Sequence, residues 1–412
     1  MALKNLLIIT YNFPPSAAVG GLRLLGFSRH LPKYGWQADV VAPPKMPWEP
    51  DDQALLDQVP AETVIYSVPF TESRIIRRLA ATDSWLPKAW IACQRAIRKR
   101  RPDAILTSGP PHHVHLLGLG LKRWHGIPWV SDFRDPWAWT IRLRDPVLGS
   151  QTSSATWWEN ILERAVVSQS DAVILNAPHS RETFVAEYPE HTGKTLVITN
   201  GYDPESFKNL AKPDVDDSIR LLYCGQIYAG RDPRPFFDAV RALLANRTEG
   251  QRPIRVDFFG SYRTTGRESD LDIEIKSRGL EHTISVHGEI SNTQSLAEME
   301  RSDILLLFDT PGRRIGVPAK LYEYIGSGRS ILAMAETDGD TAWVLRQSDS
   351  NYRFANPNES GSILRCMNEL IEAIENGHSV IDFNPRMQAF TRDNLTRQLA
   401  SVLDECTDNR SI

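Results

Sequence analysis

The chain has 412 residues, of which 41% are hydrophobic and 24% charged, and 47 basic against 51 acidic side chains give a formal net charge of -4. The hydrophobic share excludes wholesale disorder. The near balance of charge argues against a dedicated nucleic-acid binder, so we expect no nucleic-acid partner. At roughly 100–200 residues per domain, the length predicts two domains.

The sequence predicts neither a membrane span nor a signal peptide. No apolar run approaches the ~20 residues that span a bilayer, and residues 1–10 are too short and too β-rich for a signal peptide, so they predict a buried strand. The cysteines are far apart and lack a metal or redox spacing: Cys93, Cys224, Cys366 and Cys406. We therefore expect reduced thiols and a cytoplasmic protein.

Short apolar strands alternate with helix-length segments, which is typical of βαβ units and a mostly parallel sheet. The first half predicts strands at 5–10, 37–42, 63–67, 103–107, 128–131, 171–175 and 195–199, and helices at 21–33, 88–99, 112–125, 153–168 and 179–187. The second half predicts strands at 219–224, 254–259, 283–287, 303–308 and 330–334. A helical stripe is formed by Phe236, Phe237, Val240, Leu243 and Leu244.

A polar stretch without an apolar pattern, from about Asp203 to Asp217, marks the best domain boundary. We predict an N-terminal domain at 1–202, a linker at 203–218 and a C-terminal domain at 219–387. A final helix, within 388–412, is expected to pack back on the N-terminal domain. The fold class is α/β, with two doubly wound Rossmann-like domains.

Ligands of open parallel sheets bind beyond the carboxyl ends of the strands, and the first distinctive loop there is 11–21. Its Gly20-Gly21 pair enters a predicted helix, so backbone N–H groups can approach an anion. A tight turn before a helix explains the same residues.

The second candidate region follows two neighbouring strands, at 107–113 and 132–137. His112 and His113 can exchange protons near neutral pH, and Asp132, Arg134 and Asp135 suit recognition of a polar substrate. The alternative is structural: both aspartates pair with Arg134 and cap a helix, and the histidines lie on the surface.

The third region is 316–330, where Pro318 suits the first turn of a helix, and Gly326 and Gly328 suit its end. The helix would offer N-terminal amides to phosphate, and Glu323 could accept hydrogen bonds from a ribose. A solvated or salt-bridged Glu323 is the alternative.

Residues 74–101 carry nine basic side chains and one acid, Asp83, with Trp85 and Trp90 between them. Such a basic amphipathic stretch can lie on an anionic membrane surface. It can equally be a helix whose apolar stripe packs on the sheet while its charged face is solvated.

Taken in order, these segments resemble the large retaining glycosyltransferase family 4 (glycosyl transferase group 1), which has the GT-B fold. The resemblance rests on 13–21, 198–203, Gly225, 258–260, 286–289, 302–306 and 318–330. The 132–137 loop and residues 320–324 are similar to a subgroup typical of bacterial surface-polysaccharide clusters.

The resemblance implies two domains that face each other across a cleft, with a nucleotide sugar, by default a UDP-sugar, on the C-terminal domain and a saccharide or lipid-linked acceptor on the N-terminal one. It implies hexosyl transfer with retention. Apart from the resemblance, the basic stretch at 74–101 predicts, as one of its two interpretations, a peripheral contact with the inner face of an anionic membrane. No cofactor is expected, and no metal, because no Asp-x-Asp motif ends a strand. The donor-binding residues would be Gly20, Gly21, Gly225, Arg231, Pro318, Lys320, Leu321 and Glu323. The acceptor-binding residues would be Asp132 and Arg134, and the catalytic ones His112, His113 and Asp135.

The chain departs from the family at two donor positions. Gln226 stands where the family usually has an arginine, and Ile315 stands eight residues before Glu323, where it has a second glutamate. These departures keep open a nucleotide-binding GT-B-like partner protein with little catalysis. A second alternative is a nucleotide-sugar epimerase or hydrolase, which would need no acceptor.

Overall fold

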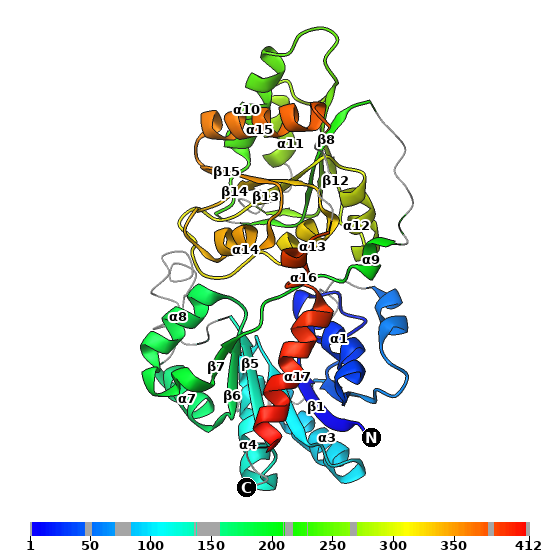
Figure 1. Ribbon diagram of the computed structural model, residues 1–412, viewed down its shortest axis with the longest axis vertical. Coiled ribbons are helices and arrows are strands. Elements are labelled where there is room, and N and C mark those ends of the chain that lie inside the picture. The colour runs from blue at the N-terminus through cyan, green and yellow to red at the C-terminus, as the bar shows by residue number, and fades with distance from the viewer. Residues whose placement is uncertain are drawn as a thin grey trace. The chain divides into compact units, whose positions relative to one another are not determined.

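The computed structural model describes residues 2–45, 52–70, 84–135, 137, 157–208, 210, 217–228, 230–263, 270–377 and 383–408. The chain forms two compact units, residues 1–200 with 392–412 and residues 201–391 (Figure 1). No helix among the described residues is long and apolar enough to cross a membrane.

Unit 1 is built on a seven-stranded sheet in which every neighbouring pair is parallel. Its strand order is β3-β2-β1-β4-β5-β6-β7. The strands are β1 (Lys4–Thr10), β2 (Trp36–Ala42), β3 (Ile65–Ser67), β4 (Ala104–Ser108), β5 (Trp129–Arg134), β6 (Ala172–Leu175) and β7 (Thr195–Val197).

Helices cover both faces of this sheet, because successive residues of each strand point to opposite sides. Leu7 and Ile9 of β1 join one core cluster with four helices, and Leu6 and Ile8 join the other with two. The first set is α3 (Leu86–Lys99), α4 (His115–His125), α7 (Trp157–Gln169) and α8 (Pro178–Glu187). The second set is α1 (Val19–His30) and α17 (Arg392–Asp408), which lie side by side in Figure 1. Short 3₁₀ helices span Leu31–Tyr34, Gln53–Gln58, His112–Val114 and Pro189–Lys194.

Unit 2 has a six-stranded parallel sheet in the order β12-β10-β8-β13-β14-β15 and a two-stranded ribbon, β11-β9. The strands are β8 (Ile219–Cys224), β9 (Ile227–Tyr228), β10 (Ile254–Phe259), β11 (Tyr262–Arg263), β12 (Ile284–His287), β13 (Ile304–Phe308), β14 (Ser330–Met334) and β15 (Tyr352–Ala355).

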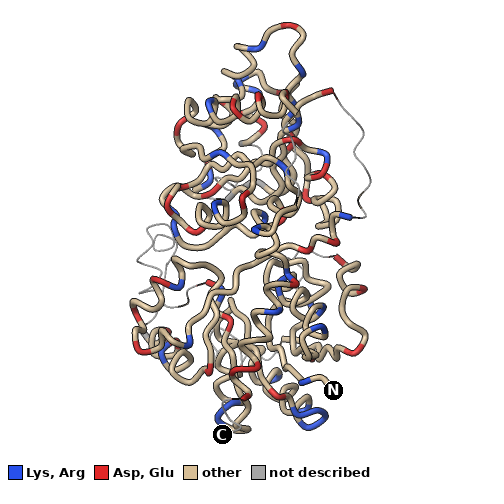
Figure 2. The backbone as a smooth tube through the Cα atoms, viewed as in Figure 1, with Lys and Arg blue, Asp and Glu red and all other residues tan. Residues whose placement is uncertain are grey.

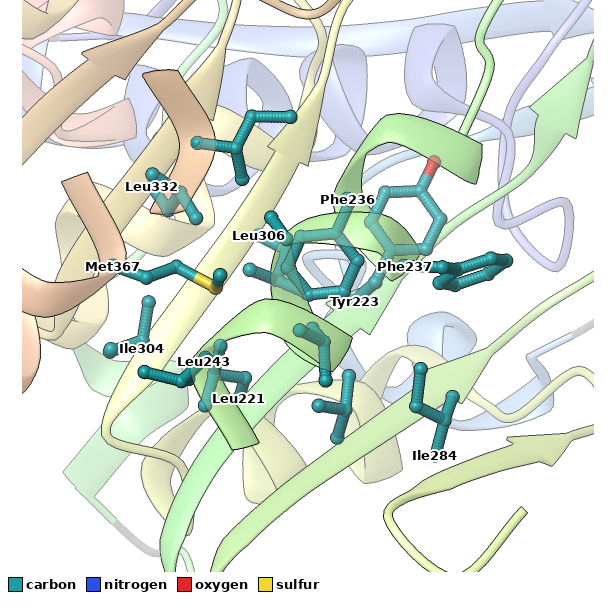
Figure 3. Close-up of a cluster of buried hydrophobic side chains, with 14 of the residues drawn as sticks. Leu221, Tyr223, Phe236, Phe237, Leu243, Ile284, Ile304, Leu306, Leu332 and Met367 are labelled. Atoms are coloured by element: carbon teal, nitrogen blue, oxygen red, sulfur yellow. The ribbon is translucent and has the colours of Figure 1, made fainter. Parts of the chain in front are cut away.

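The core of unit 2 lies between the sheet and the helices on one of its faces. Figure 3 shows Phe236 and Leu243 of α10 and Met367 of α15 meeting strand residues such as Leu221 and Leu306. The helices of this face are α10 (Arg234–Ala245), α11 (Asp270–Lys276) and α15 (Ser360–Glu375). The opposite face carries α12 (Asn292–Glu300), α13 (Lys320–Ser327) and α14 (Asp340–Ser348), and two short helices are α9 (Glu205–Lys208) and α16 (Pro385–Gln388).

The predicted fold class is confirmed, since both units are doubly wound α/β layers. Two details of the helix at 318–328 differ from the prediction. It begins at Lys320, after Pro318, and Gly326 lies inside its last turn, whereas Gly328 ends it with a left-handed φ of 68°. The predicted linker contains α9, and residues 211–216 lie outside the described part of the chain.

Candidate functional site

Each sheet has one point where the chain changes direction across it. In unit 1 this switch point lies between β1 and β4, and in unit 2 it lies between β8 and β13. Ligands of doubly wound sheets bind outside the carboxyl ends of such a strand pair. The loops that leave these four strands carry most of the residues singled out from the sequence.

In unit 1, Gly20 and Gly21 lie buried in the first turn of α1. A Cβ added to Gly21 would lie 2.9 Å from the carbonyl oxygen of Ser16, so backbone leaves no room for a side chain there. A Cβ added to Gly20 would meet the guanidinium of Arg134 and displace it. The missing side chain at Gly20 lets the Arg134 guanidinium lie directly against the start of α1.

Asp132 is fully buried near the end of β5 and pairs with Arg23 of α1. Arg23 Nε lies 3.0 Å from Asp132 Oδ2 and Nη2 lies 3.1 Å from Oδ1, and Ser108 Oγ donates to Oδ2 at 2.8 Å. The hydrogen-bonded partner of Asp132 is therefore Arg23, which reaches both carboxylate oxygens from the facing helix. The charges of Asp132 and Asp135 also act on Arg134, as the structural alternative expects.

Arg134, the last residue of β5, has a left-handed backbone with φ of 56°, which is rare for a residue with a side chain. This turn follows a register shift between β5 and β6. Arg134 Nε donates to the Gly109 carbonyl, and burial lowers the pKa of the guanidinium. Asp135 beside it is exposed and accepts a 3.3 Å hydrogen bond from Asn176 Nδ2.

The histidines form an aromatic cluster after β4. The His112 ring stacks on Trp137 with ring centres 5.6 Å apart, and His113 meets the same indole edge-on at 5.7 Å. Behind them, His115 stacks on Phe133 at 4.5 Å and its Nδ1 lies 2.8 Å from Thr107 Oγ1. Burial lowers the pKa of His113, which favours its neutral imidazole near pH 7.

His115 is fully buried, and burial lowers its pKa to about 3. The unfolded chain binds a proton at this residue below pH 6.5 and the folded chain does not. We therefore expect this residue to lower the free energy of unfolding by about 1.4 kcal/mol for each pH unit as the pH falls from 6.5 to 3. Urea unfolding of the wild type and of His115→Phe across this range tests it. Equal slopes for the two proteins would contradict the assignment.

In unit 2, Tyr324 fixes α13 to the switch point. Its hydroxyl donates to the Leu306 carbonyl of β13 at 3.2 Å and accepts from the Cys224 amide of β8 at 3.4 Å. Burial raises the pKa of this phenol far above its ordinary value, so it stays protonated as a donor. These two hydrogen bonds hold α13, and with it the first turn of this helix, against β8 and β13.

That first turn presents two charged residues, Lys320 and Glu323, and each contacts α12. Asn292 Nδ2 donates to Glu323 Oε1 at 3.0 Å, and Lys320 Nζ donates to Ser295 Oγ at 3.3 Å. The two pairs have the same three-residue spacing on both helices, so they form one polar seam. Gly225, after β8, faces it: a Cβ there would lie 3.4 Å from Lys320 Cε.

The other predicted donor residues lie around this seam. The Pro318 carbonyl accepts from the Leu321 amide at 3.0 Å, and the Leu321 side chain is buried in the core. Arg231 is buried, and its Nη1 donates to the Gln226 carbonyl at 3.5 Å. Ile315 is buried, so this position has an apolar side chain where the family that the sequence resembles usually has a second glutamate.

The sequence did not single out four polar residues of these sites: Arg23, His115, Asn292 and Ser295. Arg23 carried one signal, since it stands three residues after Gly20 on the helix and thus on the same face. The other three are defined by contacts between elements that are distant in the sequence.

Residues 20–201 match the family model described as "Glycosyl transferase 4-like domain". No curated protein matches the chain by sequence. Among solved structures, a glycosyltransferase from Rickettsia africae ESF-5 has a TM-score of 0.68 at 11% identity, over 98% of this chain and 99% of the other. Sucrose-phosphate synthase from Thermosynechococcus elongatus has a TM-score of 0.67 at 14% identity, over 98% and 100%.

A third structure is that of HepE from Anabaena in complex with UDP-glucose, with a TM-score of 0.61 at 15% identity over 99% of both chains. These likenesses show that the chain has the GT-B fold. With the match of residues 20–201, they support a glycosyltransferase.

Proposed function

We propose that the protein transfers a sugar from a nucleotide-sugar donor, a UDP-sugar, to a saccharide or lipid-linked acceptor with retention, in the synthesis of cell-surface polysaccharide. The observation that carries the proposal is the polar seam at the switch point of unit 2, where α12 holds Glu323 and Lys320 in place. The HepE structure with UDP-glucose supports the choice of donor.

In this proposal the donor binds to unit 2. Glu323 accepts hydrogen bonds from the ribose hydroxyls, and Lys320 and the first amides of α13 stabilise the diphosphate. The bond between the sugar C1 and the phosphate oxygen breaks, the acceptor oxygen bonds to C1, and its proton passes to the departing phosphate. Positive charge fixed in advance at the phosphate lowers the barrier, and no step of the proposal uses a metal ion.

Thermal unfolding with UDP, GDP, ADP, CDP and dTDP tests this. A ligand of the native state alone stabilises it by about 2.7 kcal/mol at a hundred times its Kd. We expect UDP to raise the Tm selectively, and the anomeric configuration of the product from a UDP-sugar to match that of the donor. Nucleotide binding without turnover on any acceptor would favour a GT-B-like partner protein, which the buried Ile315 would suit. Donor consumption without acceptor would favour an epimerase or hydrolase.

We also propose that residues 74–101 contact an anionic membrane from the cytoplasmic side. The structure describes residues 84–101 of this stretch. Helix α3 buries Ala89, Cys93 and Ala96 against the sheet and exposes Ile91 and Arg98. Figure 2 shows basic positions along the end of this helix. We expect retention by vesicles with anionic lipid that is lost as salt rises. Failure to bind such vesicles at low salt would contradict the contact.

A further inference from the structure

The loop that follows β13 carries an arginine, Arg313, whose guanidinium is only partly used within the protein. Its Nε donates to the Ile315 carbonyl at 3.0 Å, and its Nη1 lies 3.3 Å from Oδ1 of Asp309. In the part of the chain that the structure describes, its Nη2 has no hydrogen-bond or ion-pair partner. The side chain is 17% exposed, so the N–H groups of this nitrogen can meet a ligand.

Asp309, directly after β13, holds the guanidinium in place. This carboxylate is buried, and its Oδ1 also accepts from the Thr310 amide at 2.8 Å, while its Oδ2 accepts from the Thr341 hydroxyl at 2.8 Å. It is therefore the counter-ion of Arg313 on one side of the fork. Because a guanidinium has five donors, the remaining N–H groups can pair with an anion on the other side.

The rest of this loop is fixed by the loop after β14. Glu336 accepts from the Gly312 amide at 2.7 Å, and the buried Asp340 accepts from the Gly316 amide at 2.8 Å. Gly316 has a left-handed φ of 86°, and a Cβ there would lie 2.7 Å from Arg313 Nη2. A side chain at this position would displace the guanidinium, whereas glycine leaves it room against the backbone that leads into α13.

The loop after β13 also touches the loop after β8, across the switch point of unit 2. A Cβ on Gly230 would lie 2.8 Å from Cγ2 of Thr310, and Arg231 follows Gly230 in the chain. The same β8 loop starts at Gly225, where a Cβ would lie 3.4 Å from Lys320 Cε. Three cationic side chains therefore belong to adjoining segments at the carboxyl ends of β8 and β13: Arg231, Arg313 and Lys320.

We propose that Arg313 binds the diphosphate of the donor together with Lys320. The inference rests on the proposed function, which makes the ligand a nucleotide sugar. The planar fork of Arg313 pairs with two phosphate oxygens, whereas Lys320 supplies a point charge. Because Asp309 and the loop fix the guanidinium in advance, little reorganisation is needed as negative charge develops on the departing phosphate.

Such a contact has a signature that a structural arginine lacks, since it acts on the phosphates and leaves the nucleoside to Glu323. Thermal unfolding of the full chain with increasing pyrophosphate, UDP and uridine, at constant ionic strength, measures the three affinities separately. In Arg313→Gln we expect the affinities for pyrophosphate and UDP to fall about ten- to a hundredfold and the affinity for uridine to stay unchanged.

The matched control is Arg314→Gln. Arg314 is the next residue, its side chain is 62% exposed and it pairs with Asp338 at 2.8 Å. This variant loses the same charge from the same loop and should bind all three ligands as the wild type does. Arg313→Lys keeps a counter-ion for Asp309, so it carries the test if Arg313→Gln does not fold. Its single ammonium should recover only part of the affinity for pyrophosphate.

Unchanged binding of pyrophosphate and UDP in Arg313→Gln would overturn the inference, and so would an equal loss for uridine or a wild type that binds no pyrophosphate. If UDP binding depends on Glu323 but not on Arg313, the inference fails and the proposed function stands. If pyrophosphate binding depends on Arg313 but UDP binds no more tightly than pyrophosphate, the anion site stands and the proposed function fails.

Discussion

Replacing Glu323 with alanine lowers the affinity for UDP by about ten- to a hundredfold, because hydrogen bonds to a charged group contribute about 1.5–3 kcal/mol. The carboxylate lies half-buried on the first turn of α13, and Asn292 holds one of its oxygens at 3.0 Å. The other oxygen is available to a ribose diol. Calorimetric titration with UDP measures the loss of affinity directly. The same titration with Asn292→Ala measures how much of the affinity depends on the orientation of the Glu323 carboxylate.

The matched control is Glu281→Ala, an exposed glutamate of the same unit. It changes the net charge equally and should leave the affinity for UDP unchanged. Unchanged UDP affinity in Glu323→Ala would remove the ribose role. A loss in Glu281→Ala of the same size would show that net charge, and no particular contact, controls binding.

The fold was predictable because its signals are local. Each buried strand of a parallel sheet is a short apolar run, such as residues 304–308, and the stripe of Phe236, Val240 and Leu243 has the period of a helix. The stripe of α15 has the same period, with Ile363, Met367, Leu370, Ile371 and Ile374 buried, and could have been found in the same way. Exact ends were less predictable: Pro318 is compatible with a first turn, but the hydrogen-bonded helix begins at Lys320.

The site was predictable only in part. Parallel strands place their following loops at one edge, so Gly20, His112, Gly225 and Glu323 could be selected from the sequence. The partner of Asp132 could not be selected in this way, because Arg23 is 109 positions away in the sequence. A left-handed residue other than glycine, as at Arg134, also has no local signal, since it depends on a register shift between two strands.

Replacing Asp132 with alanine should lower the free energy of unfolding of unit 1 by about 3–5 kcal/mol, because it leaves the charge of Arg23 buried without a partner. Both side chains are almost inaccessible, at 0% and 3%. Arg23 also donates to the carbonyls of Ile198 and Thr199, so the network joins α1 to β5 and to the segment after β7. Ten of the eleven tryptophans precede residue 201, and the other is Trp343. Tryptophan fluorescence during urea unfolding therefore reports mainly on this unit.

The comparison that isolates the cause is Arg23→Met combined with Asp132→Ala. Removing both charges should recover part of the loss, since the penalty comes from one uncompensated buried ion. Asp57→Ala, at an exposed aspartate of the same unit, should change stability by no more than about 0.5 kcal/mol. If the double variant is as unstable as the sum of the two single changes, the ion pair is not what holds α1 to the end of β5. The position of the α1 N-terminus against Arg134 would then depend on the apolar packing of Leu24 and Phe27.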